Sequence, residues 1–135
     1  MSKPIQTLLG SLALLVITAN TLFHTVLLWL LALPKWLAPE GSFKQHLRGW
    51  LARVAESWIG VNNRLLSLYG NTRWDLALPP DLDRTGVYLV ISNHQSWVDI
   101  LVLQKCFNRR LPLLRFFLKR ELIWVPFLGI AWWAL

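Results

Sequence analysis

A short polar turn between two apolar runs holds the residues of this chain that are best suited to chemistry. The turn spans residues 92–99 (SNHQSWVD), after the β-favouring run 87–91 and before an apolar run at 100–103. A histidine and an aspartate separated by four residues in such a turn can meet through a hydrogen bond. The aspartate then fixes the imidazole tautomer and supports the charge that the ring gains as a base. His94 and Asp99 are therefore the candidate catalytic pair.

The polar neighbours of this pair strengthen the prediction, because the spacing alone is common by chance. Asn93, His94, Ser96 and Asp99 cluster where the flanking sequence is apolar. Burying that much polarity without a partner costs about a few kcal/mol. We expect Asn93 and Ser96 to shape the turn or to position a substrate. Ser96 as a covalent nucleophile is the rival interpretation, but the sequence around it lacks a nucleophile elbow.

Two segments carry a resemblance to a known family. Residues 93–99 resemble the NHxSxxD signature of the glycerolipid acyltransferases, the family of 1-acyl-sn-glycerol-3-phosphate acyltransferases. Residues 119–129 resemble the K-x-E-L-x-x-x-P-x-x-G segment of the same family, with Lys119 at the lysine position. Residues 117–135 look closest to the bacterial YihG-type acyltransferases. The clear resemblance covers about residues 72–135.

The resemblance implies transfer of a fatty acyl group from a thioester donor to a hydroxyl of a lysophospholipid such as 1-acylglycerol-3-phosphate. It implies His94 as general base, Asp99 as its orienting partner, and Asn93, Ser96 and Lys119 as substrate-binding residues. Acyl-CoA or acyl-carrier protein is the expected co-substrate, with no cofactor and no metal. The family carries further motifs downstream that the chain, ending at Leu135, does not reach. We therefore expect the N-terminal part of such an enzyme, and the alternative is an inactive truncated protein that binds anionic lipid.

The composition favours a lipid partner. Hydrophobic residues make up 55% of the chain and charged residues 16%, against about 25% charged in soluble domains. Nine tryptophans and a net charge of +7 suit a membrane–water interface with anionic lipids. We expect membrane lipid and the acyl donor as partners and no nucleic acid, since no nucleic-acid motif is present. The oligomeric state stays open, and the single cysteine, Cys106, excludes an internal disulfide.

The first segment, residues 1–35, is predicted to be a transmembrane or membrane-embedded helix. Residues 5–33 contain no Lys, Arg, Asp or Glu, and about 20 apolar residues suffice to cross a bilayer. A signal peptide would have a shorter apolar core. One tilted helix and a re-entrant hairpin both remain open. Basic residues accumulate after Pro34, so the positive-inside rule places the catalytic part on the cytoplasmic side of the membrane. The resemblance to bacterial acyltransferases implies that this is a bacterial inner membrane.

Residues 36–71 are predicted to form amphipathic interfacial helices. Apolar residues recur there at steps of three and four from Phe43 to Leu68, with a possible break near Gly60 and a helix stop at 69–71. The apolar stripe either packs on the rest of the protein or lies on the bilayer. His24, in the preceding segment, is either a functional residue or a neutral histidine satisfied by a neighbouring threonine.

Residues 72–135 are predicted to be the first part of an α/β acyltransferase domain with a parallel or mixed sheet. The expected elements are strands at 72–78, 87–91 and 113–118 and a helix at 99–107. A strand–helix–strand unit implies a right-handed crossover. The loop between the first two strands contains Asp81 and Asp83, which we expect to be solvated turn acids and not metal ligands.

Overall fold

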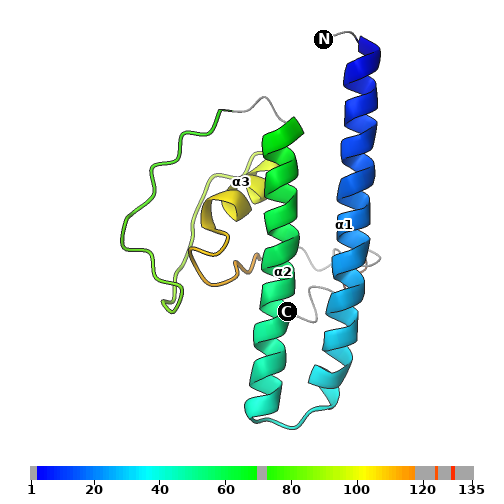
Figure 1. Ribbon diagram of the computed structural model, residues 1–135. Helices are drawn as coiled ribbons and strands as arrows, with labels where there is room; N and C mark the ends of the chain where they lie inside the picture. Colours follow the sequence, from blue (N-terminus) through cyan, green and yellow to red (C-terminus); the bar gives the residue numbers. More distant parts are fainter. Residues whose placement is uncertain (1–2, 70–72, 118–123, 125–128, 130–135) are drawn as a thin grey trace.

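In the part of the chain that the structure describes, the helices that can be followed from end to end are two long antiparallel ones and a short one (Figure 1). This computed structural model describes residues 3–69, 73–117, 124 and 129. The long helices are α1 (Lys3–Leu37) and α2 (Ser42–Tyr69), and the short one is α3 (Trp97–Phe107). α1 packs along α2, and α3 packs against α2. A long irregular segment, 73–96, leaves the end of α2 and returns to the start of α3.

α1 is an apolar helix that ends just after a proline. With 35 residues it is about 52 Å long. Pro34 lies in its last turn, where it has no N–H to donate to the carbonyl of Leu30 and so weakens the end of the helix. The N–H of Ala38 closes the end by donating to the carbonyl of Pro34 at 2.9 Å. α1 is long and apolar enough to cross a membrane, which on its own is weak evidence of membrane association.

α2 is continuous through Gly60, so the predicted break there is wrong, whereas the predicted stop at 69–71 lies at the edge of the described residues and stays a prediction. The middle of its apolar stripe faces α1. Leu51 is 1% exposed and forms an apolar cluster with Leu28 and Ala32 of α1. Phe43, at the start of the stripe, is exposed. The stripe therefore packs on α1 in its centre and is open at its beginning.

A polar layer also joins the two long helices. Nε1 of Trp58 donates to Oγ1 of Thr21 at 3.1 Å. His24 is buried, with Nδ1 2.9 Å from the carbonyl of Asn20 and Nε2 3.2 Å from Oγ of Ser57. Because a carbonyl can only accept, Nδ1 carries the hydrogen and Nε2 accepts from the serine. His24 is thus a satisfied histidine, although the hydroxyl comes from α2 and not from a neighbouring threonine.

The predicted α/β fold is wrong, because no β-strand occurs among the described residues. The predicted strands at 72–78, 87–91 and 113–118 are irregular wherever they are described. A strand exists only through the hydrogen bonds of a neighbouring strand. The segment 87–91 has no such neighbour in the described part of the chain, and Val87 and Ile91 are 101% and 85% exposed. A β-favouring sequence here gives extended backbone without a sheet.

Candidate active site

A capping box shapes the polar turn at the start of α3. Ser96 is the N-cap, with extended backbone (φ −158°, ψ 169°), and its Oγ accepts the N–H of Val98 at 3.2 Å. Oδ2 of Asp99 in return accepts the N–H of Ser96 at 2.8 Å. These bonds use N–H groups that the first turn of a helix leaves without partners. The expected helix at 99–107 is confirmed with an earlier start, and Ser96 holds the turn.

The same turn brings His94 and Asp99 together. Nδ1 of His94 lies 3.4 Å from Oδ2 of Asp99, the oxygen that also accepts the N–H of Gln95 at 2.5 Å. The backbone N–H groups of Gln95 and Ser96 therefore hold the carboxylate of Asp99 next to the imidazole of His94. The contact is slightly longer than an ordinary hydrogen bond of about 2.7–3.2 Å. The pair is therefore in electrostatic contact, and a catalytic hydrogen bond requires the two atoms to move slightly closer in the reacting complex.

The electrostatics of the pair follow from this arrangement. The N–H groups of Ser96 and Gln95, and then the nearby His94, lower the pKa of Asp99 below its ordinary value of 3.8. Asp99 is therefore ionised at neutral pH and can accept a hydrogen bond from Nδ1 of His94. The side chains of His94 and Asp99 are 66% and 30% exposed. Nε2 of the imidazole is then the nitrogen left to take a proton from an incoming molecule.

The other two predicted substrate-binding residues are placed differently. Asn93 is exposed beside His94, and the structure gives it no hydrogen bond among the described residues. Lys119 lies outside the described residues, as does most of the family-like segment at 119–129. Their roles stay predictions.

The two loop acids are solvent-exposed and Asp83 is engaged in a turn. The carboxylate of Asp83 accepts the N–H and the hydroxyl of Thr85 at 2.9 and 2.5 Å, which lowers the pKa of Asp83. The N–H of Asp83 donates to the hydroxyl of Tyr88 at 2.8 Å. Among the residues described, no group of three or more His, Cys, Asp or Glu side chains could hold a metal ion.

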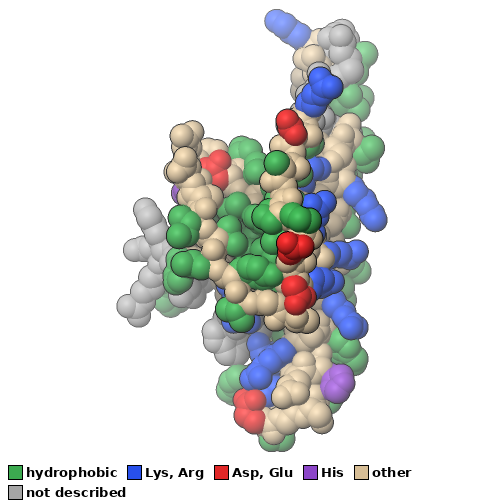
Figure 2. Space-filling model, turned by 90° about the vertical axis from the view of Figure 1, so that its left-hand side faces the viewer, with side chains coloured by type: hydrophobic (Ala, Val, Ile, Leu, Met, Phe, Trp, Pro, Cys, Tyr) green, Lys and Arg blue, Asp and Glu red, His purple; other side chains and the backbone are tan. Residues whose placement is uncertain are grey.

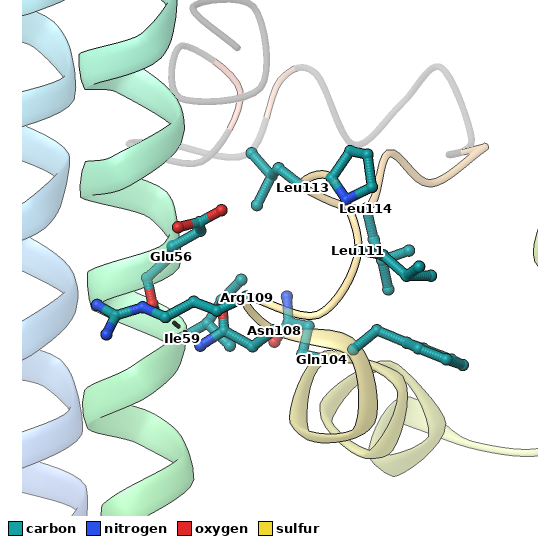
Figure 3. Close-up of a pocket in the computed structure, with 10 residues that line it drawn as sticks. Glu56, Ile59, Gln104, Asn108, Arg109, Leu111, Leu113 and Leu114 are labelled. Atoms are coloured by element: carbon teal, nitrogen blue, oxygen red, sulfur yellow. Dashed lines mark hydrogen bonds between the residues drawn. The ribbon is translucent and has the colours of Figure 1, made fainter. Parts of the chain in front are cut away.

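The contacts that attach this region to α2 were not predicted from the sequence. Nη2 of Arg84 lies 2.6 Å from Oε1 of Glu56, and Nδ2 of Asn108 donates to the carbonyl of Glu56 at 3.2 Å. Figure 3 shows Glu56 and Ile59 of α2 opposite Asn108 and Arg109 at the end of α3, around a small pocket. One available signal was that Glu56 is the only acidic residue in the sequence of α2.

A second attachment lies one turn earlier on α3. Nζ of Lys105 donates to Oγ of Ser67 at 2.7 Å and sits 4.6 Å from the ring centre of Trp74. This cation–π contact and hydrogen bond link α2, α3 and the irregular segment. Cys106, the next residue of α3, is buried, and burial raises the pKa of its thiol, which argues against a nucleophilic role.

Comparison with known proteins gives one match, and it covers the candidate site. No curated protein matches the chain, and no solved structure does. Residues 78–135 match the model of a family described as Acyltransferase. The matched segment contains His94, Asp99 and the whole of α3. This part of the chain is therefore similar to the acyltransferase family, and the match supports an acyltransferase function of a general kind.

Proposed function

We propose that the chain carries the general base, His94, and its orienting carboxylate, Asp99, of an O-acyltransferase. This enzyme would move a fatty acyl group from a thioester donor to a hydroxyl of a lysophospholipid such as 1-acylglycerol-3-phosphate. The observation that supports this most is the contact between His94 and Asp99, with the carboxylate held by two backbone N–H groups and the imidazole open to solvent. A base that is oriented and reachable is what this chemistry requires.

The reaction needs one base and no acyl-enzyme. Nε2 of His94 takes the proton of the acceptor hydroxyl while its oxygen attacks the thioester carbonyl, and a C–O bond forms. The C–S bond then breaks, and the thiolate leaves with the proton from His94 as the free thiol of CoA or of a carrier protein. Asp99 holds Nδ1–H and stabilises the imidazolium between these steps. Asn93 and Lys119 are proposed to bind substrate, and Ser96 to hold the turn that carries His94.

The two long helices support a membrane location for this activity. The surface of α1 is apolar along its length, with exposed leucines from Leu8 to Leu37. α2 carries Lys44, Arg48 and Arg53, which are suited to lipid head groups and not to the hydrocarbon interior. We propose that the α1–α2 hairpin lies along the cytoplasmic surface of a bacterial inner membrane, with α1 embedded and the basic side chains of α2 among the head groups. The acceptor lipid would then meet His94 without leaving the bilayer.

The second candidate is binding of anionic lipid without catalysis. Figure 2 favours it in one respect, because Lys and Arg side chains follow one side of the column of long helices. Such a surface attracts anionic membranes whether or not a reaction follows. The two candidates differ in one outcome only, which is whether an acylated product forms.

The test is acyl transfer from a labelled acyl-CoA to 1-acylglycerol-3-phosphate in anionic vesicles. We expect the wild-type chain to form product and His94→Ala to lose about 10²–10⁴-fold in rate, the usual contribution of a general base. His46→Ala is the matched control, since His46 is exposed on α2 and contacts only the carbonyl of Ser42 in the described structure. Vesicle binding without product in the wild type would support the second candidate and exclude the first.

A further inference from the structure

Both flanks of the candidate site are attached to one residue of α2. Glu56 is 6% exposed, and its carboxylate pairs with Arg84 in the segment before the motif. Its backbone carbonyl accepts from Asn108, the C-cap of α3, directly after the motif helix. The chain from Arg84 to Asn108 thus leaves α2 and returns to it at the same point, with His94 and Asp99 between. We call these two contacts the Glu56 clamp.

One contact of the clamp is an ion pair with a buried carboxylate, and the other is a hydrogen bond to the backbone of α2. A buried carboxylate without a partner is costly, so Glu56 strongly favours a position of the loop that brings Arg84 to it. Arg84 is itself half-exposed, so it can reach Glu56 without being buried. Asn108 is close to the helix backbone, because a Cβ added at Gly60 would lie 3.7 Å from its Nδ2. The end of α3 is therefore held against α2 at a short distance.

The side-chain amide of Asn108 lies at the contact between the end of α3 and α2. Its Oδ1 is buried and has no hydrogen-bond partner among the described residues, while its Nδ2 donates to the backbone carbonyl of Glu56. The residue that follows, Arg109, adopts a left-handed backbone (φ 63°), which is uncommon for an arginine. An unpaired buried oxygen and an unfavourable backbone at the same place indicate that the contact with α2 constrains the end of α3.

We propose that Glu56 is a positioning residue, which sets the distance and orientation of the His94–Asp99 pair relative to the α1–α2 hairpin. This inference rests on the proposed acyltransferase function. Because the hairpin is the part suited to a bilayer, the clamp fixes how the base meets an acceptor that is embedded in the membrane. An acceptor that diffuses freely in solution reaches the exposed imidazole without needing that alignment. The clamp therefore acts on membrane-embedded acceptors and not on the chemical step.

The experiment compares Arg84→Met with the wild type on two acceptors, a long-chain lysophosphatidate in vesicles and a dispersed short-chain analogue. We expect kcat/KM on the vesicle acceptor to fall about tenfold or more, since small misplacements of a catalytic group cost this much. The dispersed acceptor should change less than about twofold. Arg84→Lys keeps the charge and should restore part of the vesicle activity. Arg73→Met is the matched control, since Arg73 is exposed and has no described partner.

A second measurement reports the clamp without any activity. Cys106 is the only cysteine, is 8% exposed and lies in the last turn of α3, so its alkylation rate measures how firmly α3 is docked. We expect Arg84→Met and Asn108→Ala to raise this rate several-fold and Arg73→Met to leave it unchanged.

The outcomes separate the two proposals. Suppose that the wild type transfers acyl groups and that Arg84→Met either loses the same share of activity on both acceptors or keeps full activity on both. Glu56 is then not a positioning residue, and the acyltransferase proposal stands. If the wild type transfers no acyl group to either acceptor, both proposals fail. Unchanged alkylation in both clamp variants would overturn the clamp by itself.

Discussion

Asp99 serves two purposes through one oxygen. Its Oδ2 caps the start of α3 by accepting from Ser96 and Gln95, and the same atom lies beside Nδ1 of His94. The residue that ends the turn is thus also the residue that contacts the imidazole of His94. A local device of this kind is readable from sequence, because every partner lies within five positions of the others. This is why the spacing of His94 and Asp99 predicted their contact, whereas their catalytic role stays a proposal.

The pH dependence of α3 follows from the lowered pKa of Asp99. A carboxyl whose folded pKa lies below its unfolded value stabilises the fold at pH values above its ordinary pKa of 3.8. That contribution is lost as the pH falls through the lowered pKa, because the protonated group no longer caps the helix. We expect the NMR shifts of residues 97–101 to keep their helical character at pH values above 3.8 and to lose it only as the pH falls below that value. Asp99→Asn should remove this pH step, and a step of the same size in that variant would contradict the assignment.

At the scale of elements, the sequence predicted the helices correctly, but it also predicted a sheet that is absent from the described residues. α1 and α2 follow from apolar runs and from periodicity within one segment. A strand depends on a partner elsewhere in the chain, and the run at 87–91 has none among the described residues. The Glu56–Arg84 contact was missed for the same reason, since it joins residues 28 positions apart.

The packing of the α1–α2 hairpin gives a prediction about stability. Leu51 is 1% exposed in the apolar cluster between the two helices, so Leu51→Ala should lower the free energy of unfolding by about 2–5 kcal/mol. Leu68→Ala is the control on the same helix, and it should change the free energy by less than about 0.5 kcal/mol because Leu68 is 78% exposed. Denaturant titration in detergent micelles measures both. Equal effects would mean that α2 does not pack on α1 through Leu51.

At the scale of the whole molecule, charge and apolar surface act on the same membrane. The net charge of +7 and the exposed apolar side chains of α1 predict binding to anionic vesicles through two separate terms. Salt weakens only the electrostatic term, since the Debye length falls from about 10 Å at 0.1 M to about 3 Å at 1 M. We expect sedimentation with anionic vesicles to weaken at high salt without disappearing. Complete release at 1 M salt would show that α1 does not insert into the bilayer.

The central claim is that His94 and Asp99 act as one unit in acyl transfer. The measurement that tests it most directly is a double-mutant cycle of kcat/KM for acyl transfer with His94→Ala, Asp99→Asn and the double variant. Residues that act as a unit are strongly non-additive, because removing the base leaves its partner nothing to orient. We predict that the double variant is no slower than His94→Ala alone, within about twofold. Losses that multiply, or an Asp99→Asn variant with wild-type activity, would contradict the account.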